Sequence, residues 1–209
     1  MTQPAPRRAS DVRREPGAAL ALAPACVLLI HDFVQGHAGF ELVAGALVGF
    51  ETSVIGFEPT HKQDTRASGV TAAVTEWLEH ASTVDGVDLF VVAIGSATAA
   101  ALSASGRASA NVRALALISP RTTRGRWPPA IRESATPKLI AVGADDARAV
   151  RSMRSLEAKL VGPRLGIRIP TGEQGLALLQ SEWGSQVLEH IGVFFNRSRR
   201  AGRLPETVR

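Results

Sequence analysis

The segment Asp88–Ile94, with the sequence DLFVVAI, is apolar at every position after its first residue. A strand with one face in water alternates apolar and polar residues, whereas a strand covered on both faces is apolar throughout. This segment is therefore predicted to be a central strand of a parallel sheet. Such a sheet needs helices on both faces, so the first expectation is an α/β architecture.

The rest of the chain alternates between apolar runs and segments of helical periodicity, which supports that architecture. The further predicted strands are Cys26–Ile30, Thr52–Phe57, Val112–Ile118, Lys138–Val142 and Gly166–Ile169. The predicted helices are 38–47, Val70–His80, 97–105 ended by Gly106, Ala147–Leu160, and Gly175–Phe195 with a break near Gly184. Prolines hold residues 119–136 in a predicted loop.

The net charge of +5 is concentrated at the two ends of the chain. Residues 1–16 carry a net +2 and residues 197–209 a net +4, which leaves −1 for the segment between them. Both ends are predicted to be mobile basic tails that flank a single domain of residues 17–196. Aromatic residues make up 5% of the chain and tyrosine is absent, which argues against a nucleic-acid-binding surface.

No cofactor and no metal ion is predicted from the motifs. The first strand lacks the glycine-rich turn of a dinucleotide site, and neither a P-loop nor a zinc-binding histidine pattern occurs. Cys26 is the single cysteine and is expected to be a small core residue in a strand, which excludes an internal disulfide. No apolar run reaches the roughly 20 residues that span a bilayer. We therefore expect a soluble cytoplasmic protein without a membrane partner.

Four segments resemble, in order along the chain, the functional loops of the α/β-hydrolase fold, in particular its compact thioesterase- and esterase-like members. Val27–Phe33 resembles the strand that ends in a His-Gly oxyanion motif, with Asp32 at the glycine position. Val91–Ala97 resembles the nucleophile elbow, Lys138–Asp146 the loop with the catalytic acid, and Pro170–Gly175 the loop with the catalytic histidine. The resemblance implies a three-layer sandwich with a mainly parallel sheet and no lid domain.

The elbow normally reads G-x-S-x-G, because small residues must flank the nucleophile where strand meets helix. If Ser96 is the nucleophile, the flanking residues are Ile94 and Thr98, which are both β-branched. If Gly95 occupies the turn, they are Ala93 and Ala97, which are both small. The second register fits the steric requirement better, and it leaves a hydrogen atom where the nucleophile would be.

The base and the acid are also incomplete. The resemblance places Gln174 at the position of the histidine, and an amide cannot accept a proton at neutral pH. Glu173 is a conceivable but weak substitute base. Asp146 matches the position of the acid, although it could equally be the N-cap of the following helix. The alternative acid position, in Leu117–Pro120, holds no carboxylate.

The candidate binding residues are His31, Asp32, Phe33, Gly95 and Gln174, which lie in the segments that carry the resemblance, and Trp127, which lies in the proline-rich loop of residues 119–136. Trp127 is interpreted either as part of a partner-binding loop over the site or as an anchor in an exposed loop. His31 could shape the oxyanion loop or make a structural hydrogen bond.

The preferred hypothesis is a hydrolase-fold protein without a complete triad, which binds a small acyl-type ligand or a protein partner and could form a homodimer. The alternative is an active ester or thioester hydrolase in which Ser96 works with Asp146 or His31. A third hypothesis is an interaction module that acts through its arginine-rich tails.

Overall fold

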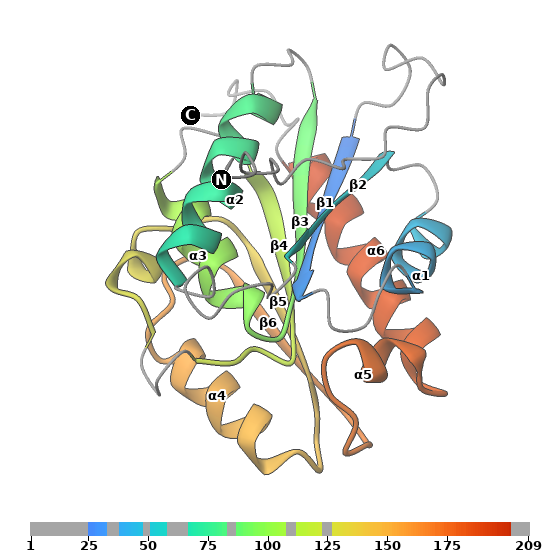
Figure 1. The fold of residues 1–209 in the computed structure, drawn as a ribbon. Helices are drawn as coiled ribbons and strands as arrows, with labels where there is room; N and C mark the ends of the chain where they lie inside the picture. The colour runs from blue at the N-terminus through green and yellow to red at the C-terminus, as the bar shows by residue number, and fades with distance from the viewer. Residues whose placement is uncertain are drawn as a thin grey trace, which may run out of the picture.

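Six parallel strands form one sheet between two layers of helices (Figure 1). The computed structural model describes residues 25–32, 38–47, 51–57, 67–82, 87–107, 112–122 and 127–201. The strands are β1 (Ala25–Asp32), β2 (Glu51–Phe57), β3 (Asp88–Ile94), β4 (Val112–Ile118), β5 (Lys138–Gly143) and β6 (Arg164–Ile169). Their order in the sheet is β2-β1-β3-β4-β5-β6, and every neighbouring pair is parallel.

The helices cover both faces of this sheet, which confirms the predicted three-layer architecture (Figure 1). One layer contains α2 (Ala67–Ser82), α3 (Ala97–Arg107) and α4 (Ala147–Glu157). The other contains α1 (Ala38–Ala46), α5 (Leu176–Gln180) and α6 (Gly184–Ala201). Within the described residues, the link from β4 to β5 holds only the short 3-10 helix η2 (Pro129–Arg132), so no lid domain is present there.

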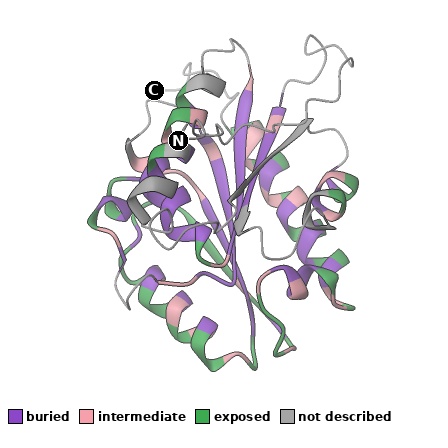
Figure 2. Cartoon of the chain, viewed as in Figure 1, coloured by how far each residue is buried: buried purple, intermediate pink, exposed green. Residues whose placement is uncertain are grey.

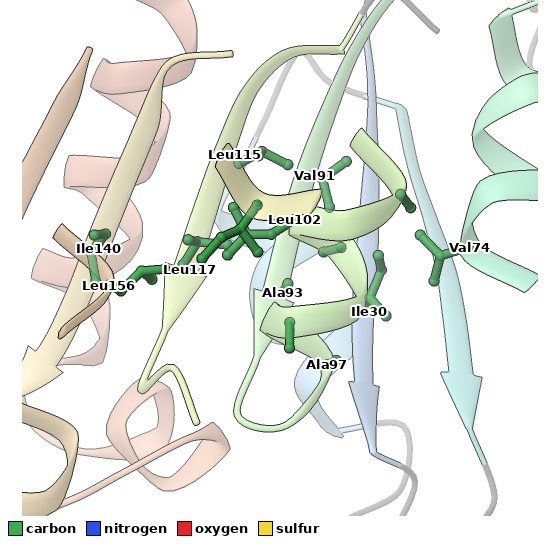
Figure 3. Close-up of a cluster of buried hydrophobic side chains, with 14 of the residues drawn as sticks. Ile30, Val74, Val91, Ala93, Ala97, Leu102, Leu115, Leu117, Ile140 and Leu156 are labelled. Carbon is green, nitrogen blue, oxygen red and sulfur yellow. The ribbon is translucent and has the colours of Figure 1, made fainter. Parts of the chain in front are cut away.

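Two apolar clusters, one on each face of the sheet, make up the core. Figure 2 shows that buried residues lie in the strands and in helices of both layers. Figure 3 shows the first cluster, in which Ala93 and Leu117 of the sheet lie beside Leu102 of α3, while Val74 and Leu156 come from α2 and α4. Every residue of β3 is buried, as predicted for a strand covered on both faces. None of the helices in the described ranges combines the length and apolarity that crossing a bilayer requires.

Several predicted element boundaries were wrong. Helix α3 continues through Gly106 to Arg107, so this glycine does not end the helix. It allows close packing instead. A Cβ atom on Gly106 would lie 2.8 Å from the carbonyl oxygen of Ala130 in η2. Helix α4 ends at Glu157 instead of Leu160, and β6 begins two residues earlier than predicted, at Arg164.

The predicted break near Gly184 is confirmed, because α5 ends at Gln180 and α6 begins at Gly184. A Cβ atom at this position would lie 1.8 Å from the carbonyl oxygen of Leu179, so only glycine fits the tight turn between the helices.

The predicted start of the C-terminal tail at residue 197 was wrong, because α6 continues to Ala201. Arg199 lies in this last part of the helix, and its Nε atom is 3.6 Å from a carboxylate oxygen of Asp88 at the start of β3. Arg113 of β4 binds the same carboxylate at 2.7 Å. This ion-pair cluster holds the end of α6 against the sheet. The predicted N-terminal tail, residues 1–16, and residues 202–209 lie outside the described residues.

A buried lysine at the first position of β5 joins two loops. The ammonium group of Lys138 donates to the carbonyl oxygens of Ser134 at 2.6 Å, Thr136 at 2.5 Å and Val161 at 3.3 Å. Burial, together with the nearby guanidinium of Arg164, lowers the pKa of Lys138 to about 8. The three carbonyl groups supply the partners that a buried amine needs, so this lysine has a structural role.

Candidate functional site

The loops that follow β3, β4, β5 and β6 meet at one edge of the sheet, because parallel strands end on the same side. Main-chain hydrogen bonds connect each loop to the next. The N–H of Gly95 donates to Ile118 at 2.9 Å, the N–H of Ser119 to Ala141 at 2.8 Å, and the N–H of Ala144 to Ile169 at 2.7 Å. Ligands of parallel α/β sheets bind at this edge, which makes it the candidate site.

At the turn between β3 and α3, Gly95 adopts a backbone conformation with φ of +62°. Its carbonyl oxygen accepts hydrogen bonds from the Thr98 hydroxyl at 2.8 Å and from the N–H of Arg121 at 3.2 Å. A Cβ atom built on Gly95 would meet no other atom within 4 Å, so this position faces open space. The structure thus gives Gly95 the left-handed conformation at the apex of the turn, in the register with small neighbours.

Ser96 follows the apex residue and is exposed, and Ala97, the first residue of α3, is buried. The hydroxyl of Ser96 therefore lies one residue beyond Gly95, the residue with the positive φ. The catalytic role of Ser96 stays a prediction.

Ser119 connects the end of β4 to the loop after β6. Its hydroxyl oxygen accepts a hydrogen bond from the N–H of Gly175 at 2.8 Å, and its side chain is fully buried. Ser119 has a φ of +46° although it precedes Pro120, and a residue before proline normally favours an extended backbone. Strained backbone of this kind concentrates at functional sites. No local sequence signal identifies this residue.

The carboxylate of Asp146 is the N-cap of α4, which confirms the capping role considered from the sequence. Its Oδ1 atom accepts hydrogen bonds from the N–H groups of Arg148 at 2.9 Å and Ala149 at 3.1 Å. The neighbouring Asp145 is exposed, and its own N–H donates to the carbonyl oxygen of Thr171 at 3.1 Å. Asp146 thus has a structural task that needs no histidine.

We expect Asp146→Ala to lower the free energy of unfolding by about 1 kcal/mol, because the variant loses the acceptor for two free helical N–H groups. Asp145→Ala is the matched control and should change stability by less than about 0.5 kcal/mol, since its exposed carboxylate caps no helix. Urea unfolding followed by circular dichroism measures both. Equal losses in the two variants would contradict the assigned cap.

The loop after β6 places Glu173 and Gln174 at the surface, and residues 170–175 of this loop contain no histidine. Thr171 organises this loop, because its hydroxyl accepts the N–H of Glu173 at 3.2 Å. Among the histidines, only His190 has a side chain within the described part of the chain, and it is exposed on α6, which covers a face of the sheet.

The end of β1 carries His31 and Asp32, which pair with Gly56 and Phe57 of β2. Because β1 also pairs with β3, the last residues of β1 lie near the end of β3, which leads into the turn at Gly95. The side chains of His31 and Asp32, and Phe33 as a whole, lie outside the described residues, so their binding roles stay predictions.

Of the two interpretations of Trp127, its burial supports the anchor, because this side chain is 8% exposed and belongs to the core cluster that contains Leu102 and Ile131. The binding role of Trp127 stays a prediction. Its indole N–H has no hydrogen-bond partner among the residues that the structure describes. Helix η2, which follows Trp127 in the chain, packs on α3, and its Ile131 belongs to the same core cluster as Trp127. In the described ranges, no group of three acidic, histidine or cysteine side chains is arranged to hold a metal ion.

No protein-family model matches the chain, and no curated protein matches its sequence. Solved structures, in contrast, match it over most of its length. A lipase-esterase related protein from Clostridium acetobutylicum superposes with a TM-score of 0.65 at 11% identity, covering 82% of this chain and 95% of the other. Dienelactone hydrolase from Anabaena variabilis gives 0.62 at 16% identity, covering 83% and 86%. Est1E from Butyrivibrio proteoclasticus gives 0.63 at 12% identity, covering 85% and 89%.

At these identities the similarity establishes the fold, which is that of the α/β-hydrolases, as the order of the four loops indicated. The neighbours include esterases, lipases and a dienelactone hydrolase.

Proposed function

We propose that this α/β-hydrolase-fold protein does not hydrolyse esters, and that it uses the carboxyl edge of its sheet to bind a small acyl-type ligand or a protein partner. The observation that carries the proposal is the conformation of Gly95. This residue has the positive φ of the apex between β3 and α3, and a hydrogen atom takes the place of a nucleophilic side chain there. Nucleophilic catalysis needs a side-chain nucleophile aimed at the reacting carbon and a base in contact with it.

The other two positions of the triad support the same proposal. Gln174 stands in the loop after β6, where the resemblance expects a histidine, and its amide cannot act as a general base. The Oδ1 atom of Asp146 accepts hydrogen bonds from two N–H groups of α4. Gln174 and Asp146 are both compatible with a stable fold and with ligand binding. Removal of the proton from a serine hydroxyl would need a general base, such as a histidine, in contact with it.

An active hydrolase that uses Ser96 is the second candidate. It is favoured by the exposure of this serine directly beside the apex, where its hydroxyl could be reached from solvent. The residues of the β1 end, His31 among them, would then have to supply the base.

Treatment with a fluorophosphonate probe and with p-nitrophenyl butyrate distinguishes the two candidates. Our proposal expects no stoichiometric labelling, and esterase activity equal to that of Ser96→Ala, which keeps the backbone of the turn and removes only the hydroxyl. Labelling at Ser96 that the alanine variant abolishes would overturn the proposal and establish an active serine hydrolase.

A further inference from the structure

Strand β6 forms an exposed edge of the sheet. Its residues Arg164, Leu165, Gly166 and Arg168 are exposed and Ile167 is partly buried. Among the described strands, β6 pairs with β5 alone. The other described edge of the sheet is β2. An exposed edge strand presents unpaired main-chain groups that can pair with another extended segment.

The direction of these main-chain groups follows from the hydrogen bonds at the two ends of β6. The carbonyl oxygens of Pro163 and Ile169 accept the N–H groups of Lys138 and Ala144 on the β5 side. Main-chain groups of successive residues in a strand point to opposite sides. The N–H and C=O groups at positions 164, 166 and 168 therefore point away from β5, toward the open edge.

The side chains at these same positions lie on the face of the sheet that α4 covers. A Cβ atom on Gly166 would meet the side chains of Met153 and Glu157 in α4, so Arg164 and Arg168, which share its face, flank that helix. Arg164 also donates to the carbonyl oxygen of Leu160 at 3.3 Å. The opposite face of β6 is apolar, with Leu165 48% exposed.

Further cationic side chains lie on the solvent side of α4 and in the turn that follows it, next to Arg164 and Arg168 of β6. Residues 147–168 carry six basic side chains and a single acid, Glu157, for a net charge of +5. All six are exposed, and none lies within ion-pair distance of a carboxylate in the described part of the chain: Arg148, Arg151, Arg154, Lys159, Arg164 and Arg168. We call this set the basic face.

We propose that the open edge of β6 binds an extended acidic segment of a partner protein, which adds a seventh strand to the sheet. Alternate acidic side chains of that segment would lie beside Arg164 and Arg168, and the apolar side chains between them would cover Leu165 and Ile167. Main-chain pairing supplies affinity in this mode of recognition, and the alternating side chains supply specificity.

Two other occupants fit the observations less well. Antiparallel pairing of two copies about Gly166 would bring Arg164 of one copy opposite Arg168 of the other, and like charges directly opposite one another destabilise a strand pair. A single-stranded nucleic acid would need aromatic side chains for its bases, and residues 147–168 contain none.

The test uses the full chain and a fluorescently labelled peptide of the sequence Glu-Val-Glu-Val-Glu-Val-Glu, with binding followed by fluorescence anisotropy. We expect saturable binding that weakens with added salt. Arg164→Glu/Arg168→Glu should weaken it by at least about tenfold and should gain binding of the corresponding Lys-Val peptide. Arg197→Glu/Arg200→Glu, which reverses two exposed charges on α6, is the matched control and should bind the acidic peptide nearly as well as the wild type. The gain of binding to the basic peptide shows that the charge-reversed variant is folded.

Two versions of the acidic peptide separate strand addition from simple charge attraction. One is N-methylated at the glutamates and the other at the valines, so each loses the donors along one side of an extended chain. If the peptide binds by strand addition, one version should no longer bind the protein and the other should still bind it. Equal binding of both versions, or binding of a single-stranded oligonucleotide or phosphatidylserine vesicles in place of the peptide, would overturn the proposal. Self-association of the free protein that Leu165→Glu abolishes would also overturn it.

Discussion

The double variant Gly95→Ser/Gln174→His is expected to react with a fluorophosphonate probe at least about a hundredfold faster than the wild type, because general-base assistance contributes at least that factor. The new serine would stand at the apex of the turn, where the structure leaves open space for a Cβ atom. The new histidine would stand at the position that the resemblance assigns to the base, in the loop that Ser119 holds against the end of β4. Mass spectrometry of the labelled protein measures both the rate and the site.

The two single variants are the controls for this prediction. Gly95→Ser supplies a nucleophile without a base and Gln174→His a base without a nucleophile, so neither should approach the rate of the double variant. A serine at a φ of +62° is strained, so both variants that contain it should be less stable by about 1–3 kcal/mol. If the Gln174→His variant alone became labelled at Ser96, our assignment of the apex to Gly95 would be wrong.

The second large effect is expected for Gly143→Ala, at the end of β5. A Cβ atom there would lie 2.5 Å from the carbonyl oxygen of Thr171 and 2.6 Å from that of Glu173. These are backbone atoms, so the whole loop after β6 must move. We expect a loss of about 3 kcal/mol in the free energy of unfolding, as for other overpacked sites. Urea unfolding followed by tryptophan fluorescence measures it.

Gly45→Ala is the matched control for this substitution. Gly45 is exposed in α1, and a Cβ atom there would meet nothing within 4 Å. Because alanine favours helix over glycine, this variant should be more stable by about 0.5–1 kcal/mol. A Gly143→Ala variant as stable as the wild type would mean that the two loops are not in the contact described.

The sequence predicted the sheet well, because burial on both faces leaves a direct trace in the residues. Asp88–Ile94 and Val112–Ile118 were predicted with the bounds that the structure has. It predicted the packing of loops less well. Gly106 was interpreted as a helix end, whereas its role depends on Ala130, which is distant in sequence.

Parts of the candidate site could not be predicted for the same reason. The steric pattern around Gly95 is local, so the favoured register could be derived from neighbouring residues. The hydrogen bond of Ser119 to Gly175 joins residues 56 positions apart, and the sequence before a proline argues against its backbone conformation. The basic face was missed because the net charge was summed over the whole domain. The domain has a net charge of −1, although residues 147–168 within it have a net charge of +5.

The loops at the carboxyl edge are connected mainly by main-chain atoms: Gly95 to Ile118, Ser119 to Ala141, Ala144 to Ile169 and Asp145 to Thr171. Main-chain hydrogen bonds of this kind do not depend on which side chains these residues have, so most substitutions leave them in place. A lineage could therefore exchange its reactive groups one at a time without passing through an unfolded ancestor. Substitutions at this edge would then change the chemistry of the surface while leaving its main-chain scaffold in place.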